Sequence, residues 1–231
     1  MTRSKLHDLI ELANEPSSAR RRELLRGVTD LFFAGDGDHG NSELALFDDI
    51  MGQLASDMEE AVRGELSKRM AQASAPPRHL LRDLARDTAL SVAEPILTES
   101  SALTDDDLLA VAHTRGQDHL RAISQRRQVS AAVSEAIVER GDDRTLDTLL
   151  RNDGAELSRE SHERVIDRAM VNSELHAAVV SRRAVPVDLL NEMYFVVEAQ
   201  LRDGIRDRNS EVDPEALEAA LAASRKSLAT R

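Results

Sequence analysis

The sequence predicts an all-α protein, built for most of its length from short helix pairs that repeat along the chain. Apolar residues recur at helical spacing in almost every segment, and no segment shows the sustained apolar–polar alternation of strands. The same apolar pattern also returns about every 27 residues between residues 76 and 185. Stacked repeats of this length predict a right-handed α-solenoid with an extended concave surface.

The composition of the chain limits the kinds of partner that it can bind. The chain has 231 residues, 41% of them hydrophobic and only 2% aromatic, so its core must be aliphatic. Its formal net charge of −12 repels nucleic-acid phosphates, and we expect no DNA or RNA partner. Cysteine is absent, which excludes disulfides and thiolate-bound metals. We expect no cofactor and no metal.

Residues 1–40 predict an N-terminal helical segment. Apolar positions at i, i+3, i+4 and i+7 indicate one helix over residues 6–13 and another over residues 24–32, with a polar break at residues 14–18. The start of the chain lacks the apolar centre of a signal peptide. No run approaches the roughly 18 apolar residues of a membrane span, so we expect a soluble cytoplasmic protein.

A loop rich in Gly, Asp and His, FFAGDGDHGNSE, follows the second helix. Counted from Asp36 as a calcium loop, the fifth position is Gly40 and the twelfth is Phe47, where an oxygen ligand and a glutamate are required. The loop is therefore interpreted as a flexible joint and not as an ion site. Asn41 or Ser42 is expected to cap the helix that follows it.

The repeats are predicted over residues 41–211. Their starting positions, 27, 26, 28 and 28 residues apart, are Pro76, Leu103, Val129, Leu157 and Val185. Two adjacent apolar columns in the first helix are Leu84/Ala85, Val111/Ala112, Ile137/Val138, Val165/Ile166 and Met193/Tyr194. Two more in the second helix are Val92/Ile96, Leu120/Ile123, Leu146/Leu149, Leu175/Val179 and Leu201/Ile205. An earlier unit, starting near Leu54, shows the same pattern 30 residues before Leu84.

Capping residues mark the first helices of several repeats. Thr104 with Asp107 predicts a capping box, and Ser130 and Ser158 are expected to cap their helices. Pro186 suits a first helical turn.

The last predicted element is a C-terminal capping or linker helix over residues 212–231. Asp213 is expected to cap it and Pro214 to occupy its first turn. Its apolar stripe is thin, so the sequence leaves its role open.

The stretches over residues 80–97, 103–112 and 175–186 resemble HEAT-type and leucine-rich-variant helical repeats. More narrowly, the chain resembles the alphaproteobacterial domain-of-unknown-function 2336 family over residues 6–201. That resemblance implies an α-solenoid in a bacterial cytoplasm and carries over no catalytic residue, because the family has no established activity. The N-terminal segment also loosely resembles VHS and ENTH domains.

Two groups of arginines are candidate anion-binding or partner-binding sites. Near the N-terminus, the group consists of Arg20, Arg21, Arg22 and Arg26. Four neighbouring acidic residues dilute its positive charge, which favours a solvated helix face over a membrane-binding site.

The second group consists of Arg126, Arg127, Arg182 and Arg183. Each pair ends the second helix of a repeat, where positive charge complements the helix dipole. Because the pairs recur at similar repeat positions, we expect them to line one ridge that could receive an acidic or phosphorylated partner.

Other polar groups are given structural roles. His162 is followed by Glu163, which superficially resembles a histidine-kinase phosphoacceptor, but a surface histidine on a repeat helix is favoured. Asp105, Asp106 and Asp107 are expected in the first turn of a helix, where acidic residues are favourable.

The functional hypothesis is a non-catalytic interaction or scaffold module that binds a protein or peptide. One alternative is a peripheral membrane adaptor that uses the N-terminal arginines. A second is a phosphotransfer-type signalling protein. The sequence sets no oligomeric state.

Overall fold

The structure, a computed structural model, describes residues 17–34, 39–197 and 199–230. All regular elements in these ranges are helices. Pairing of the β type is limited there to one isolated parallel bridge, between Val129 and Ala155. The predicted all-α class is confirmed.

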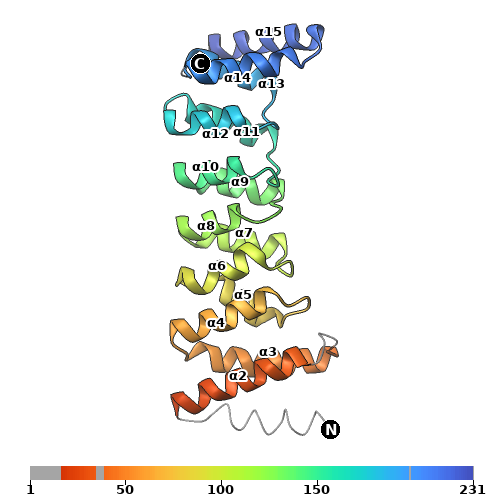
Figure 1. Cartoon of the computed structure of the whole chain (residues 1–231), viewed down its shortest axis with the longest axis vertical. Helices are drawn as coiled ribbons and strands as arrows, with labels where there is room; N and C mark the ends of the chain where they lie inside the picture. The colour runs from red at the N-terminus through yellow and green to blue at the C-terminus, as the bar shows by residue number, and fades with distance from the viewer. Residues whose placement is uncertain (1–16, 35–38, 198, 231) are drawn as a thin grey trace. The chain divides into compact units, whose positions relative to one another are not determined.

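The chain forms two compact units that divide between Ala122 and Ile123, within α8 (Gln117–Ser124). Before α8, the described helices of the first unit are α2 (Ser18–Ala34), α3 (Asn41–Ser56), α4 (Glu60–Ala71), α5 (Arg78–Ala85), α6 (Leu90–Glu99) and α7 (Asp105–Thr114) (Figure 1). Those of the second unit are α9 (Ala131–Arg140), α10 (Asp143–Arg151), α11 (Arg159–Ala169), η1 (Ser173–Leu175), α12 (His176–Ser181), α13 (Val187–Glu192), η2 (Met193–Phe195), α14 (Ala199–Ser210) and α15 (Pro214–Thr230).

In the first unit, helices pack on their second neighbours in the chain. α3 packs on α5 and α4 packs on α6, while α2 packs on α3. Gly64 of α4 lies beside the backbone of α6, since a Cβ atom there would lie in van der Waals contact, 3.4 Å from the carbonyl oxygen of Ser91. Beside it, Ser67 Oγ donates a hydrogen bond to the carbonyl of Val92. A small residue and a buried polar contact thus join two helices about one repeat apart.

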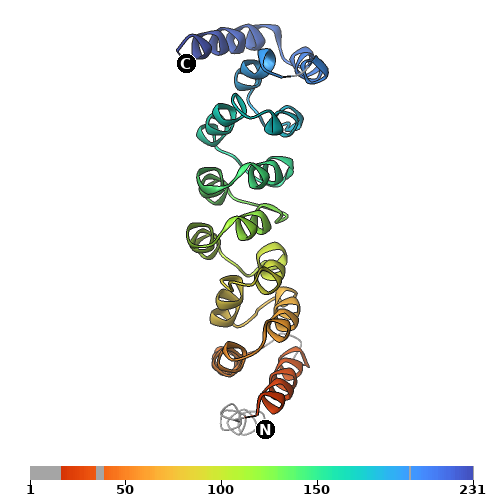
Figure 2. The same cartoon turned by 90° about the vertical axis from the view of Figure 1, so that its left-hand side faces the viewer.

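The second unit shows the same alternation. α9, α11, α13 and α15 pack one on the next, and so do α10, α12 and α14 (Figure 2). The parallel bridge between Val129 and Ala155 links the loops before successive helix pairs, with Glu156 N donating to the Val129 carbonyl at 2.8 Å. Such regular spacing matches the repeat period found in the sequence.

A series of side-chain contacts to main-chain carbonyls runs through the second unit, and we call it the carbonyl relay. Asn152 Nδ2 donates to the carbonyls of Ser124 and Arg126 at 2.8 and 2.7 Å. Arg182 Nη1 donates to the carbonyl of Asn152 at 2.9 Å. Arg208 Nη1 then donates to the carbonyl of Arg182 at 2.9 Å. Each relay residue, Asn152, Arg182 and Arg208, therefore closes the carbonyl end of the preceding helix pair.

The predicted core columns are buried with two exceptions. Tyr194 and Leu201 are only half-buried. Tyr194 lies in η2, and its hydroxyl accepts a hydrogen bond from Arg206 Nη2 at 2.8 Å. Its ring also lies under the guanidinium of Arg202, 5.7 Å from the ring centroid. The regular pattern ends here because α13 stops at Glu192 and a 3-10 turn replaces its last helical turn.

The predicted caps are confirmed for Thr104, Ser130 and Ser158. Thr104 and Asp107 form the complete capping box, and the two serines accept from backbone N–H groups in the first turns of α9 and α11. The cap predicted at Asn41 or Ser42 is wrong, because α3 already begins at Asn41 and its N-cap is Gly40.

Two further predictions concern the starts of helices α13 and α15. Pro186 is the N-cap of α13 and precedes the first turn, because the extended backbone at Pro186 delays the helix by one residue. Asp213 Oδ2 accepts from the N–H groups of Glu215 and Ala216, as expected of a cap for α15.

Some predictions fall outside the described residues, namely the helix over residues 6–13 and the loop residues 35–38. The predicted boundaries after residues 40 and 211 stay predictions. Within the described ranges, none of the helices has both the length and the apolar character needed to cross a membrane.

Candidate interaction surfaces

The N-terminal arginine group is largely neutralised by acidic residues of the first unit. Arg21 pairs with Asp57 at 2.8 Å, and Arg22 pairs with Glu59 at 3.1 Å. Further along α2, Arg26 Nη2 lies 2.8 Å from Glu65 of α4, and Arg69 of α4 pairs in return with Asp30 of α2. Arg20 is exposed on the same helix. These pairs hold α2 along α4 and leave little net positive charge for an anionic surface.

The predicted arginine ridge is wrong for Arg182. Its side chain is 3% exposed and donates to carbonyls at and after the end of α10, so it points into the protein. Arg183 and Arg127 are exposed, while Arg126 is half-buried. The Arg182–Arg183 pair thus divides into one residue that joins two repeats and one that faces solvent, because adjacent residues after a helix end point in different directions.

His162 is buried and not on the surface as predicted. It is 4% exposed, and its Nδ1 lies 3.0 Å from the Ser158 carbonyl, to which it must donate. Burial lowers the pKa of His162, and the charges of Arg182 and Arg159 lower it further, although the bond to Ser158 opposes the shift. A buried neutral imidazole is poorly placed to receive a phosphoryl group from another protein.

A cleft of about 350 Å³ opens in the first unit between α3 and α5. Its lining includes Gly52 of α3, Arg63 of α4, Asp83 of α5 and Asp87, which follows α5. This volume lies at the lower end of the range for ligand pockets, roughly 300–1,000 Å³. The cleft is large enough for a side chain of a partner.

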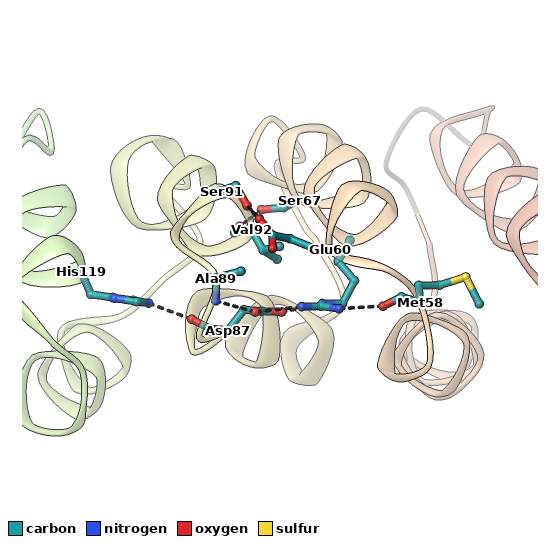
Figure 3. Close-up of polar contacts among 9 residues, drawn as sticks. Met58, Glu60, Ser67, Asp87, Ala89, Ser91, Val92 and His119 are labelled. Atoms are coloured by element: carbon teal, nitrogen blue, oxygen red, sulfur yellow. Dashed lines mark hydrogen bonds and ion pairs between the residues drawn. The ribbon is translucent and has the colours of Figure 1, made fainter.

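Two of the lining residues, Arg63 and Asp87, form an ion pair, and Figure 3 shows the contacts of Asp87. Arg63 Nε donates to Asp87 Oδ2 at 2.6 Å, and Nη2 donates to Oδ1 at 3.1 Å. Nη1 of the same guanidinium donates to the Met58 carbonyl at 2.6 Å. A forked pair of this kind holds both side chains in one orientation.

Asp87 has further partners from two other elements. Its Oδ1 also accepts from the N–H of Ala89, and its carbonyl accepts from His119 Nε2 of α8 at 2.8 Å (Figure 3). Burial alone would raise the pKa of Asp87. The hydrogen bonds from Arg63 and Ala89 outweigh burial, with help from the charges of Arg63 and Arg115, and hold that pKa below its usual value. Asp87 is thus an ionised, fixed wall of the cleft.

This ion pair is not among the sites predicted from the sequence. Arg63 and Asp87 are 24 residues apart, close to the repeat period, so a search for opposite charges one repeat apart could have found them. In the described part of the chain, no three His, Asp or Glu side chains gather in a way that could hold a metal ion.

Comparison with known proteins identifies a family. The family described as "Uncharacterised protein conserved in bacteria (DUF2336)" matches residues 92–231, which is more than half of the chain. The chain belongs to the DUF2336 family. The match starts at Val92 in α6 and extends through the C-terminal helix, so the carbonyl relay lies inside the DUF2336 region while the cleft lies before it. Searches of curated proteins and of solved structures gave no match.

Proposed function

We propose that this DUF2336 protein is a non-catalytic interaction module of the bacterial cytoplasm that binds a protein or peptide on its helical repeats. Each compact unit would be a short α-solenoid of HEAT-like pairs. The carbonyl relay supports the repeat assignment, since its contacts join positions 26 to 30 residues apart. The loose likeness of the N-terminal segment to VHS and ENTH domains is fold-level analogy and adds no function.

The observation that carries the proposal is the cleft between α3 and α5. It is open to solvent, and its lining residues Arg63 and Asp87 hold each other in one orientation before any partner binds. A rigid recess reduces the entropy that binding must overcome. Repeat proteins commonly bind partners on the surfaces formed by successive helices.

The two alternatives have less support. A peripheral membrane adaptor would need the charges of Arg21, Arg22 and Arg26, and these are paired with Asp57, Glu59 and Glu65. A phosphotransfer protein would need an accessible His162, and this side chain is 4% exposed.

Site-specific photo-crosslinking in the source bacterium tests the proposal. A photoreactive benzoylphenylalanine at the exposed position Thr88 faces the cleft, and one at exposed Glu94 of α6 serves as the matched control. We expect irradiation to join a defined protein to the position-88 variant and not to the control. Absence of any cross-linked protein at position 88 would contradict the proposal.

A further inference from the structure

The cleft contains one exposed carboxylate besides that of Asp87. Asp83 is exposed on α5 and, among the described residues, has no hydrogen-bond or ion-pair partner for its side chain. The other carboxylate, Asp87, is already bound by Arg63 and by the N–H of Ala89. Among the described lining residues, Arg63 is the one positive side chain and is bound to Asp87, so the lining has one more negative than positive side chain. Arg115 lies outside this lining, and its charge acts on Asp87.

Three aliphatic residues contribute to the lining of the cleft. Ala55, Leu80 and Leu84 line it, and each is almost fully buried, so they form a floor and not a projecting wall. On the α3 side, Gly52 leaves open space, since a Cβ atom there would meet nothing within 4 Å. The cleft therefore combines a small aliphatic patch, of which little is exposed, with the exposed carboxylate of Asp83.

We propose that the cleft receives a lysine or arginine side chain from an extended segment of the partner, with Asp83 as the recognising carboxylate. The inference rests on the proposed function above. An aliphatic stem would cover Ala55 and Leu84 while the charged head reaches Asp83, as long basic side chains do at apolar surfaces. The net charge of −12 favours the approach of such a basic segment.

The test is a two-dimensional NMR titration of the ¹⁵N-labelled full chain. The probe is the peptide acetyl-Ala-Lys-Leu-Lys-Ala-amide, compared with versions that carry norleucine or glutamate in place of both lysines. We expect saturable shifts at the amides of Gly52, Leu84 and Thr88 with the lysine peptide, weaker binding of the norleucine peptide, and no binding of the glutamate peptide. Raising the salt concentration should weaken the binding of the lysine peptide and leave that of the norleucine peptide unchanged.

Matched variants separate recognition from general electrostatics. Asp83→Asn should raise the Kd of the lysine peptide at least fivefold, whereas Asp106→Asn, an exposed aspartate of α7, should leave it unchanged. Equal Kd values for Asp83→Asn and the unmodified chain would overturn the inference, and so would shifts confined to residues outside the cleft. Because both substitutions are exposed, the variants should keep the amide spectrum of the folded chain.

The cross-linking experiment keeps this inference distinct from the proposed function. If position 88 captures the same protein in equal yield with and without Asp83→Asn, the interaction module stands and recognition by Asp83 is wrong. If the lysine peptide binds as expected but position 88 captures no protein, the cleft has the proposed chemistry and the cellular function is wrong.

Discussion

Arg208 donates from Nη1 to the main-chain carbonyl of Arg182 at 2.9 Å, and Arg182 donates in the same way to Asn152. Both acceptors lie just after the end of a helix, where carbonyl groups have no intrahelical partner. A guanidinium supplies several donors in a fixed plane and also complements the negative end of the helix dipole. The relay thus adds side-chain donors to carbonyls at these turns, where the carbonyls of Asn152 and Arg182 also accept from the N–H groups of Ala155 and Val185.

Replacing Arg182 should destabilise the second unit strongly. Arg182→Ala leaves the carbonyls of Leu150, Asn152 and Ala155 without this donor, and we expect a loss of about 3 kcal/mol. Arg183→Ala changes an exposed neighbour and should cost no more than about 0.5 kcal/mol. Urea unfolding followed by circular dichroism measures both. Equal losses for the two variants would contradict an inward role of Arg182.

Gly154 should not tolerate a side chain. A Cβ atom there would lie 2.0 Å from the carbonyl oxygen of Arg127, so the backbone next to the bridge at Val129 must move. For Gly154→Ala we expect a loss of about 1–3 kcal/mol in unfolding free energy. Gly52→Ala is the control, because it has open space and replaces a mid-helix glycine, which should stabilise by roughly 0.5–1 kcal/mol. Thermal unfolding of the two variants should therefore shift in opposite directions.

Asp87 should make the first unit sensitive to acid. Its pKa is lowered in the folded chain, so it contributes stability that is complete above the unfolded value of about 3.9 and is lost as the pH falls through the folded value. Asp87→Asn should lower the free energy of unfolding by about 2 kcal/mol at neutral pH, and it should reduce the further loss of stability at acid pH. Urea midpoints measured from pH 7 downward test it. The matched substitution Asp83→Asn removes a carboxylate that has no partner among the described residues, and it should leave the loss of stability at low pH unchanged. If stability falls with pH equally in Asp87→Asn and in the unmodified chain, the expectation is wrong.

His162 should affect the stability of the second unit at a higher pH than Asp87 affects that of the first. The unfolded chain protonates this histidine near its ordinary pKa of about 6.5, whereas the folded chain holds the pKa lower. Stability should therefore fall as the pH is lowered from above 6.5 towards the folded value, because the unfolded state binds the extra proton. His162→Gln should reduce that slope, and His113→Gln, at an exposed position of α7, should not. Stability measured by urea unfolding between about pH 7 and pH 5 distinguishes them.

Much of the fold could be predicted because it depends on local patterns. Helical periodicity gave the all-α class, and the fixed repeat spacing gave nearly all of the buried columns. Capping at Thr104 was predictable since its partner, Asp107, is three residues away in the chain. The failure at Tyr194 arises where a 3-10 turn breaks the period, and no residue type there marks that turn.

The candidate sites were harder to predict because they depend on side-chain direction. Arg182 and Arg183 are the same residue type at adjacent positions, and only the packing of the repeats decides which one faces inward. Likewise, the cleft is defined by Arg63 and Asp87, whose pairing depends on how α4 packs near the end of α5. Clusters of like charge, such as the N-terminal arginines, were predicted as candidate binding sites. In the structure, most of those arginines form ion pairs with acidic residues of the same unit.

All contacts of the carbonyl relay run in the same direction along the chain. Every relay donor comes from a later part of the chain than its acceptors, so during synthesis the carbonyl of Asn152 gains its side-chain donor only when Arg182 has emerged from the ribosome. The carbonyl of Arg182 likewise gains its side-chain donor only with Arg208. A chain cut before Arg208 would lose α15 and the end of α14, and with them the donor to the carbonyls of Arg182, Arg183 and Val185. It would also leave exposed polar groups on the helix pair that remains, and damage at the C-terminal side should spread backwards through the repeats.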